Sequence, residues 1–352
     1  MRRTMLAACC FAMLAGAAIG APPATPDLKA IGAAFSELAD GAMPSTVALR
    51  VYKVLSEPDA RVKATMALGH GSGFAVADGG FILTNHHVVA GADEIIVILH
   101  DGTFLEAALI AADRRSDLAV LQIEAQIEPL RVGGQTRAGR WIFAVGNPKG
   151  IARSSGRMSF TWGTVSAVGR DMTRILSKDG AGRYYGNMIE ADISVHPGSS
   201  GGPLLNADGE VVGIVSAMSP PEKGRPSTAA YAIPLDRHAM RVVAALLDGK
   251  EVEYGFLGVE IAALDLSTRK KLGLPRPLRG ALVTAAYAGL PAEAAGLVAG
   301  DVITAFEGRP IAMPNDLVLA VGATPVGSVV RLDYWRGEAL SVNVALARRE
   351  VE

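Results

Sequence analysis

The sequence predicts a mainly β protein, an antiparallel sandwich or barrel, followed by a small α+β unit. After Pro44, short β-rich runs alternate with Gly-containing turns, and few segments have helical spacing. Near residues 250–254 the pattern changes, and strand-like runs begin to alternate with two short helical stretches. The length of 352 residues also exceeds what one ordinary core holds, which indicates at least two domains.

The first 21 residues have the pattern of a secretory signal peptide. Arg2 and Arg3 precede an apolar run from Met5 to Ile19, and small residues follow. This run is about 15 residues long, shorter than the roughly 20 that a membrane-spanning helix needs. We therefore expect cleavage near residue 21 and an exported protein, periplasmic or secreted. An uncleaved membrane anchor is the alternative.

The overall composition argues against several classes of partner. Lys plus Arg (34) nearly equals Asp plus Glu (35), which predicts neither a nucleic-acid surface nor an acidic tail. Both cysteines, Cys9 and Cys10, lie in the leader, so a cleaved chain would contain no disulfide. No stretch after residue 25 approaches membrane-spanning length. We expect no nucleic-acid partner and no stable membrane insertion after cleavage.

The remaining segments define four expected parts. Residues 27–40 place apolar side chains on one helical face, and residues 237–249 form a second apolar helix that stops at Gly249. The C-terminal strands are expected around FLGVEIAAL, GALVTAAY, DVITAFEG and VVRLDYWR, and its helices at PAEAAG and PNDLVLAVGA. The parts are a signal peptide (1–21), an N-terminal segment with a short helix (22–43), a β domain (44–250) and an α+β domain (254–350).

The stretch HPGSSGGPLLN, residues 196–206, predicts a nucleophile. Two adjacent serines, Ser199 and Ser200, lie between glycines just before an apolar run. A serine hydroxyl needs a base within hydrogen-bond reach, and the base needs a group that orients it. Glycines allow backbone N–H groups to point at a reacting carbonyl without side chains in the way. The alternative is a Gly-rich turn without chemistry.

Two other segments supply candidate partners for the serine. In ILTNHHVV, the adjacent His86 and His87 point to opposite sides if the chain is extended, so at most one can face the serine. Asp117, at the head of the apolar run DLAVLQI, is well placed to accept an imidazole N–H. A zinc site formed by His86, His87 and His196 is the alternative, but no ligand spacing repeats. We expect no metal and no organic cofactor.

These motifs together carry a family resemblance. TNHHVV, SDLAVL and HPGSSGGPLLNADGEVVGIVSA resemble the trypsin-like serine endopeptidases of the HtrA/Deg type. YGFLGV and GLPAEAAGLVAGDVITAFEGRPI resemble their PDZ domain. The resemblance extends from about residue 30 to 350. It implies two antiparallel β-barrels that form a trypsin-like protease domain, followed by a small α+β PDZ domain.

The resemblance also implies catalytic roles. His87 matches the base, Asp117 the orienting acid and Ser200 the nucleophile, while Ser199 stands where the family has Asn. Gly198, Ser199 and Ser200 match the oxyanion hole, with the N–H groups of Gly198 and Ser200 as donors.

The resemblance further places the substrate on the strand GIVSAM. Ser216 would lie near Asp117, and Ser216, Ala217 and Met218 would flank the pocket for the residue before the cut. Because Ser194 rather than an acid stands six residues before Ser200, we expect small or aliphatic side chains in that pocket.

Two further regions keep alternatives open. Phe256, Leu257 and Gly258 match a carboxylate-binding PDZ loop, to which a peptide would add as an extra strand. The family often has a basic residue just before this loop, but here Glu253 and Tyr254 precede it, so the domain could instead only pack or oligomerise. The polar segment 171–188 is either a solvated loop or, as the resemblance implies, an activation loop that orders before the oxyanion hole forms.

The sequence therefore predicts an exported, ATP-independent serine endopeptidase that cleaves unfolded or damaged proteins. The resemblance implies peptide C-termini or internal segments as PDZ partners and a homotrimer or higher multiple as the assembly. A chaperone-like or peptide-binding protein with latent protease activity is one alternative. A hydrolase of small esters is another, although no G-x-S-x-G precedes a helix.

Overall fold

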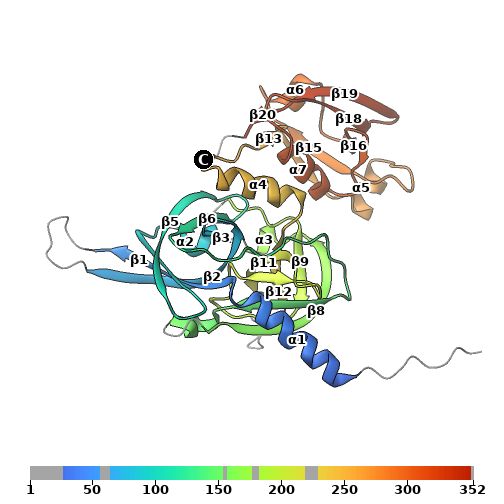
Figure 1. Ribbon diagram of the computed structural model, residues 1–352. Coiled ribbons are helices and arrows are strands. Elements are labelled where there is room, and N and C mark those ends of the chain that lie inside the picture. The colour runs from blue at the N-terminus through green and yellow to red at the C-terminus, as the bar shows by residue number, and fades with distance from the viewer. Residues whose placement is uncertain (1–26, 56–63, 154–156, 177–181, 219–228, 350–352) are drawn as a thin grey trace, which may run out of the picture. The chain divides into compact units, whose positions relative to one another are not determined.

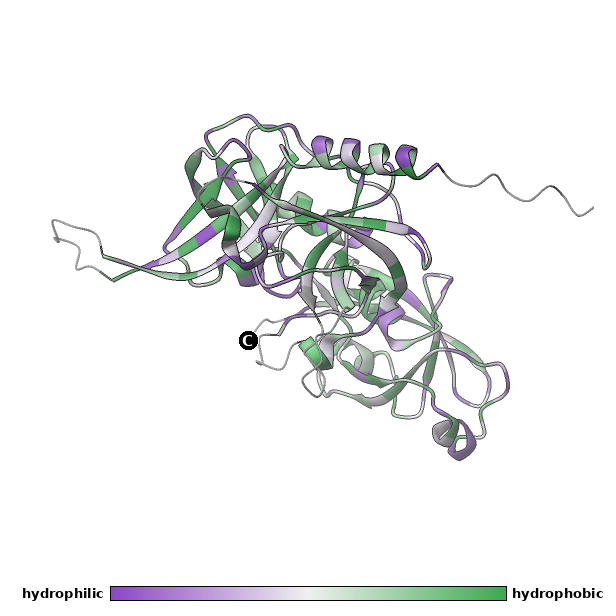
Figure 2. Ribbon diagram, turned by 90° about the horizontal axis from the view of Figure 1, so that it is seen from below, coloured by the Kyte–Doolittle hydropathy of each residue, from purple (hydrophilic) through white to green (hydrophobic). Residues whose placement is uncertain are grey.

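The computed structural model describes residues 27–55, 64–153, 157–176, 182–218 and 229–349. The predicted signal peptide and part of the segment 171–188 lie outside these residues. The chain divides into two compact units, residues 1–37 and 38–352, which are described separately. Helix α1 (Leu28–Ala42) begins in the first unit and its last residues belong to the second. It starts after Asp27, whose carboxylate accepts hydrogen bonds from the backbone N–H groups of Lys29 and Ala30. Hydrophilic and hydrophobic residues alternate along α1 (Figure 2).

The second unit begins with a closed antiparallel barrel in the strand order β1-β2-β3-β6-β5-β4 (Figure 1). A short helix, α2 (His86–Val89), follows β3 directly. The barrel interior is filled by fully buried aliphatic side chains such as Leu49, Ile82 and Leu121. The strands are β1 (Thr46–Val54), β2 (Thr65–Ala77), β3 (Phe81–Asn85), β4 (Glu94–Ile98), β5 (Phe104–Asp113) and β6 (Leu118–Ile123).

A second closed barrel follows, in the order β10-β11-β12-β9-β8-β7. Ile142, Leu204 and Val215 are among its buried residues. The 3₁₀ segment η1 (Pro148–Arg153) and helix α3 (Thr173–Leu176) lie between its strands in the chain. Helix α4 (Arg237–Leu247) follows β12 and contacts β5 and β6 of the first barrel. The strands are β7 (Trp141–Gly146), β8 (Ser159–Arg170), β9 (Met188–Asp192), β10 (Pro203–Leu205), β11 (Val211–Met218) and β12 (Ala229–Pro234).

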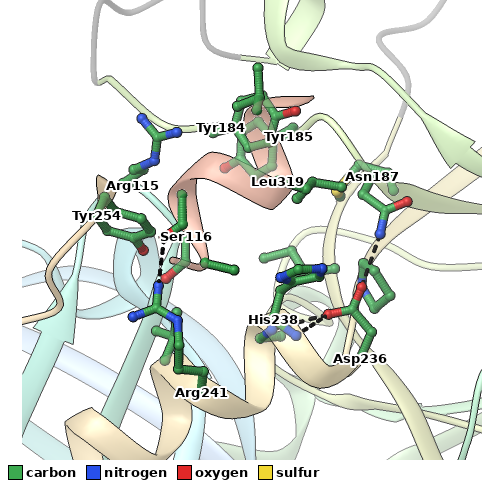
Figure 3. A pocket seen from close by; sticks show the side chains of 18 residues that line it. Arg115, Ser116, Tyr184, Tyr185, Asn187, Asp236, His238, Arg241, Tyr254 and Leu319 are labelled. Atoms are coloured by element: carbon green, nitrogen blue, oxygen red, sulfur yellow. Dashed lines mark hydrogen bonds between the residues drawn. The ribbon is translucent and has the colours of Figure 1, made fainter. Parts of the chain in front are cut away.

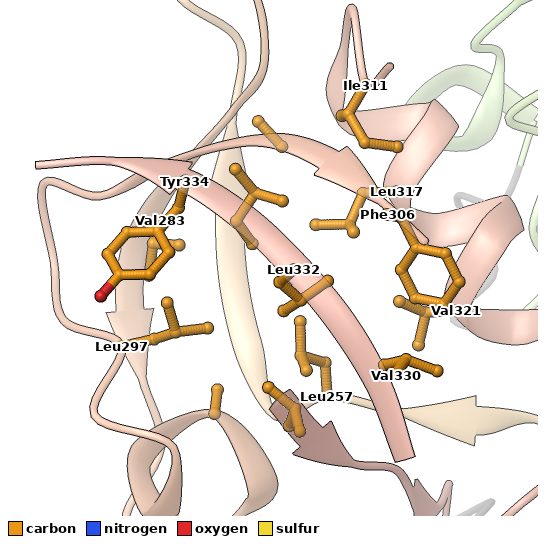
Figure 4. Packing of buried hydrophobic residues seen from close by; sticks show 14 of the residues in the cluster. Leu257, Val283, Leu297, Phe306, Ile311, Leu317, Val321, Val330, Leu332 and Tyr334 are labelled. Carbon is orange, nitrogen blue, oxygen red and sulfur yellow. The ribbon is translucent and has the colours of Figure 1, made fainter. Parts of the chain in front are cut away.

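The C-terminal part is an α+β fold on a sheet in the order β14-β15-β16-β18-β19, with β17 paired to β16 and a separate β13–β20 pair. Leu257, Leu317 and Leu332 pack into one apolar core between the sheet and α7 (Figure 4). The elements are β13 (Gly255–Phe256), β14 (Val259–Ala262), α5 (Leu266–Lys271), β15 (Ala281–Ala286), α6 (Pro291–Ala294), β16 (Val302–Phe306), β17 (Arg309–Pro310), α7 (Pro314–Gly322), β18 (Val329–Trp335), β19 (Ala339–Ala345) and β20 (Ala347–Arg348).

The predicted fold class is confirmed, since the protein is mainly β with two closed six-stranded barrels before an α+β domain. The structure also contains β19 and α5, which were not predicted. Strand β19 pairs with β18 over its whole length, and Leu340, Val342 and Val344 alternate toward the core, so the period-2 pattern could have indicated it. Helix α5 contains no buried residue and depends on Asp265, whose carboxylate accepts the backbone N–H of Thr268.

Among the described residues, no helix combines the length and the apolar character that crossing a membrane requires.

Substitution of one buried leucine tests the C-terminal core. Leu332 is fully buried on β18, whereas Val329, three residues earlier on the same strand, is 66% exposed. We expect Leu332→Ala to lower the free energy of unfolding of this domain by about 2–5 kcal/mol, because it leaves a cavity. Val329→Ala should change it by less than about 0.5 kcal/mol. Urea denaturation followed by circular dichroism measures both. Equal effects of the two substitutions would contradict the described packing.

Candidate active site

The pairing of β3 with β6 brings the two histidines to the aspartate. The antiparallel register sets Asn85, the last residue of β3, opposite Leu118, the first residue of β6. The buried amide of Asn85 donates to the carbonyl oxygen of Asp117 at 3.0 Å, which fixes the end of the strand pair. Residues that are 30 positions apart in the chain, His87 and Asp117, therefore become neighbours.

His87 is held by Asp117 at two points. The imidazole Nδ1 of His87 lies 2.7 Å from Oδ2 of Asp117, and the backbone N–H of His87 donates to Oδ1 at 2.9 Å. With Nδ1 protonated and donating to the carboxylate, Nε2 is the nitrogen left to accept a proton. The carboxylate thus selects the tautomer that a general base requires.

The carboxylate of Asp117 is completely buried and has further donors. The hydroxyl groups of Tyr185 and Ser216 donate to Oδ2 at 2.9 and 3.0 Å, and Nε of Arg183 lies 3.6 Å from Oδ1. Burial by itself raises the pKa of Asp117, but the hydrogen bonds and charge of His87, with the bond from Tyr185, outweigh it and lower the pKa overall. Asp117 therefore stays ionised. Its backbone φ of 58° is unusual for a residue other than glycine.

His86 lies on the other side of the turn. Its backbone N–H donates to the carbonyl of Asp117 at 3.0 Å, while its half-buried Nδ1 has no hydrogen-bond partner among the described residues. Burial lowers the pKa of His86. The imidazole is therefore poised to remain neutral, and only His87 reaches the carboxylate of Asp117. No group of three or more His, Cys, Asp or Glu side chains that could hold a metal ion occurs in the described part of the chain.

The glycines of HPGSSGGP allow the chain to turn sharply against barrel 1. Gly198 has a φ of 100° and Gly201 a φ of 87°, where side chains are strained. A Cβ atom at Gly198 would collide with the carbonyl of Asn147, and one at Gly201 with the carbonyl of Ser72. Ser72 of β2 holds this turn, because its N–H donates to the carbonyl of Ser200 at 2.8 Å and its Oγ donates to that of Gly198 at 2.7 Å.

The turn leaves two backbone donors available. The N–H of Ser199 donates to the carbonyl of His196 at 2.9 Å and is used within the turn. Among the described residues, the N–H groups of Gly198 and Ser200 have no backbone acceptor. Three residues are predicted for the oxyanion hole. Gly198 and Ser200 have the free N–H donors that an oxyanion needs, whereas the N–H of Ser199 is used within the turn and Ser199 only links the two.

The hydroxyl of Ser200 does not bond to His87 in this structure. It donates to the carbonyl of Ser216 at 3.1 Å, and no hydrogen bond joins it to His87 across the described residues. Catalytic hydrogen bonds are often absent or long in unliganded enzymes. Ser216 therefore contacts both Ser200, through its carbonyl, and Asp117, through its hydroxyl.

The strand that carries Ser216 has an available edge. Ala217 and Met218 pair with Tyr231 and Ala230 of β12, but the pairing of β11 with β10 reaches only Ile214. In the described part of the chain, the other edge of Ser216–Met218 is thus open to an added strand. The side chains of Ala217 and Met218 lie outside the described residues, so the predicted pocket is located here by the backbone alone.

Matches to known families agree with this geometry. Residues 71–214 match the trypsin-like peptidase domain, and residues 282–336 match the PDZ domain. A relative from Ectopseudomonas mendocina, named "Probable periplasmic serine endoprotease DegP-like", is 38% identical over 90% of this chain. A relative of the same name from Hahella chejuensis is 40% identical over 79% of it. The chain spans 62% and 57% of the lengths of these two relatives.

Solved structures of proteases are also similar to this chain. The "HtrA-type protease AlgW with tripeptide" is similar with a TM-score of 0.75 and 29% identity, covering 90% of this chain and 98% of that one. A serine endoprotease from Yersinia pestis is similar with a TM-score of 0.63 and 25% identity, at the same coverage. The chain is thus similar to HtrA-type proteases over most of its length. It joins a trypsin-like peptidase domain to a PDZ domain, as the sequence predicted.

A cavity of about 100 Å³ is lined by Ser116, which precedes Asp117, and by Tyr185, whose hydroxyl donates to Asp117 (Figure 3). Its walls come from the segment before β6, the segment before β9, α4 and α7. The hydroxyl of Tyr184 donates to Oδ1 of Asn315 on α7 at 2.9 Å, and the amide of Asn315 donates to the carbonyl of Gly186 at 2.6 Å. Burial raises the pKa of Tyr184 and Tyr185, so both phenols remain neutral donors.

Two residues of the site, Ser72 and Tyr185, were not predicted from the sequence. Ser72 lies between two glycines in GHGSGF, a pattern similar to that around Ser200, and this could have marked a close backbone contact. Tyr185 belongs to the polar segment 171–188, of which the described residues Tyr185 and Met188 are buried. The expectation of a solvated loop is therefore wrong for this end of the segment. No pattern in YYGNM indicates that one tyrosine reaches Asp117.

The buried histidines predict a pH-dependent stability. Burial lowers the pKa of His86 and of His238 below the ordinary value of 6.5, so the folded state binds protons less readily than the unfolded state. Their contribution to stability is complete above that value and is lost as the pH falls below it. We expect the melting temperature to fall between about pH 7.5 and pH 5, and His86→Asn to flatten this dependence.

Thermal denaturation followed by circular dichroism at several pH values measures the effect. His100→Asn, at an exposed histidine, is the matched control. A pH dependence that is identical in the parent protein and in His86→Asn would rule out His86 as a source.

Proposed function

We propose that the chain is an exported, ATP-independent serine endopeptidase. The proposal rests mainly on the 2.7 Å contact of His87 Nδ1 with the buried carboxylate of Asp117, beside the Gly-rich turn that carries Ser200. It is supported by the names of the relatives, which are called periplasmic serine endoproteases. The peptidase domain is proposed to span residues 44–250 and the PDZ domain residues 254–350.

The proposed reaction is acyl transfer. The hydroxyl of Ser200 rotates from the carbonyl of Ser216 toward Nε2 of His87 and attacks the peptide carbonyl, while His87 takes its proton. The negative charge that develops on the substrate oxygen is held by the N–H groups of Gly198 and Ser200. His87 then gives its proton to the leaving amine, and water hydrolyses the acyl-enzyme by the reverse sequence. Asp117 keeps Nδ1 of His87 protonated throughout.

The proposed substrates and the proposed assembly rest on the similarity of this chain to HtrA-type proteases. Unfolded or damaged polypeptides of the cell envelope are the proposed substrates, and the segment 1–21 is the proposed export signal. The open edge of Ser216–Met218 would pair with the substrate strand, and the PDZ domain would bind peptide segments. AlgW, a related HtrA-type protease, has been solved with a decapeptide and with a tripeptide. A homotrimer or higher multiple is the proposed assembly.

A second candidate function is a chaperone-like or peptide-binding protein with latent protease activity. The observation in its favour is the hydrogen bond of Ser200 to Ser216 instead of His87. A site in which Ser200 never reaches His87 would bind polypeptides without cutting them.

Cleavage of reduced casein by the chain from about residue 21 separates these functions. We expect Ser200→Ala to lose on the order of 10⁶ in turnover, since it removes the nucleophile. Ser199→Ala, the matched control beside it, should retain activity, because its N–H remains in the turn. Activity is measured by the appearance of fragments. A parent protein that is inert even with added peptides would favour the second candidate, and an active Ser200→Ala would exclude Ser200 as the nucleophile.

The tyrosine pair offers a test of Asp117 positioning. Tyr185→Phe removes a hydrogen bond to the ionised carboxylate, and we expect kcat/KM for a peptide substrate to fall on the order of tenfold. Tyr184→Phe is the control, because its hydroxyl bonds to Asn315 rather than to Asp117. Equal kinetics for the two variants would refute the positioning role.

A further inference from the structure

The PDZ groove has the shape and lining of a peptide site but lacks the expected basic residue before its loop. The groove lies between β14 and α7, with apolar walls from Leu257, Val259, Ile261, Leu317 and Val321. Glu253 and Tyr254 occupy the positions where a cation would be expected. The charge that could receive a peptide carboxylate must therefore come from elsewhere.

Two arginines line the same groove from other segments. Arg349 follows β20, and its N–H donates to the carbonyl of Tyr254 at 3.1 Å, which places it beside the loop. Its guanidinium lies 5.3 Å from the ring centre of Phe256. Arg115 comes from barrel 1, two residues before Asp117, and its guanidinium lies 4.8 Å from the ring of Tyr254 and 5.4 Å from that of Tyr184 (Figure 3).

Neither of these two charges is neutralised within the described part of the chain. The adjacent Arg348 pairs with Glu251 at 2.8 Å and with Glu253 at 3.7 Å, whereas Arg349 and Arg115 have no ion pair there. The nearby carboxylate of Asp113 accepts the hydroxyl of Tyr254 instead. Burial, followed by the charge of Arg349, lowers the pKa of Arg115. Arg115 is partly buried and Arg349 is exposed, and both line the groove without an ion pair in the described residues, so the two like charges favour the binding of an anion there.

The loop itself supplies backbone donors next to these charges. Leu257 and Gly258 give their carbonyl oxygens to Ala292 and Tyr287, but their own N–H groups have no backbone acceptor among the described residues. Gly258 has a φ of 78°, and a Cβ atom there would collide with Leu290. Successive free N–H groups at such a turn form a concave site for a carboxylate.

We infer that Arg349 and Arg115 form a carboxylate clamp, which holds the C-terminal carboxylate of a peptide against the N–H groups of Leu257 and Gly258. The apolar walls of the groove would take an apolar last side chain. Because Arg115 belongs to barrel 1, the peptidase domain completes the PDZ site and contacts its ligand directly. This inference deepens the peptide-binding role of the PDZ domain and rests on the proposed function only for that role.

Peptide binding to the full chain tests the clamp. The Ser200→Ala background prevents cleavage, and the probes are a fluorescein-labelled peptide that ends in Leu-Val with a free carboxylate and the same peptide with a C-terminal amide. Fluorescence anisotropy gives both dissociation constants. We expect the acid to bind at least about tenfold more tightly than the amide, as a charge-assisted contact predicts.

The variants assign the preference to the arginines. Arg349→Gln and Arg115→Gln should each bring the affinity for the acid toward that for the amide, and Arg349→Lys should keep part of the preference. Arg348→Gln, at the neighbouring arginine that is already paired, should leave the ratio of the two constants unchanged. If Arg115→Gln does not fold, as judged by circular dichroism, Arg349→Gln decides alone.

Three results would overturn the inference. They are equal affinity for acid and amide in the parent, no binding of either peptide up to about millimolar concentration, and a preference that survives Arg349→Gln. The casein experiment fails independently of this one. An inert peptidase that still prefers the acid would refute the proposed proteolysis and leave the clamp intact.

Discussion

The buried carboxylate of Asp117 is the group on which the arrangement of the site depends. It has no access to solvent, yet it stays ionised because hydrogen-bond donors from several chain segments contact it. His87 follows β3, Tyr185 precedes β9, and Ser216 lies on β11. Since β3 belongs to the first barrel and β9 and β11 to the second, one carboxylate joins both barrels. A misplacement of either barrel would leave a buried charge with too few donors, which is strongly unfavourable.

A second constraint is the close approach of β2 to the turn that carries Ser200. A Cβ atom at Gly201 would collide with the carbonyl of Ser72 on β2, and one at Gly198 with the carbonyl of Asn147, which follows β7. Ser72 fixes this approach by two hydrogen bonds, and in doing so it directs the carbonyl oxygens of Gly198 and Ser200 toward barrel 1. The N–H groups of the same residues remain without backbone acceptors. The free donors of the proposed oxyanion hole are thus a consequence of how the two barrels pack.

The contacts of the PDZ domain extend this organisation. Asn315 of α7 binds both the hydroxyl of Tyr184 and the carbonyl of Gly186, next to the residue that reaches Asp117. On the other side, Tyr254 donates to Asp113, and Arg115 lies against the rings of Tyr184 and Tyr254. The segment that leads to Asp117 therefore also borders the PDZ groove, through Arg115. The inferred clamp would place a bound peptide against this segment.

The sequence by itself determined the fold class and indicated which residues are the candidates for catalysis. Strand-like runs between Gly-containing turns encode the barrels, because alternation and turn chemistry are local properties. The motifs around His87, Asp117 and Ser200 are local as well, and the adjacent His86 and His87 diverge in helix α2 as they would in an extended strand. The sequence also indicated that the glycines around Ser200 leave backbone N–H groups, such as that of Gly198, able to point at a reacting carbonyl.

Only the tertiary structure decided which distant side chains complete these groups. Tyr185 is 68 residues from Asp117 and Ser216 is 99, and no periodicity relates them. Ser72 meets Gly198 across 126 residues, and the barrel packing alone sets that distance. Arg115 and Arg349 are ordinary surface-type residues in the sequence, but they meet in one groove. Such contacts depend on register and on the packing of whole domains, which a local pattern does not contain.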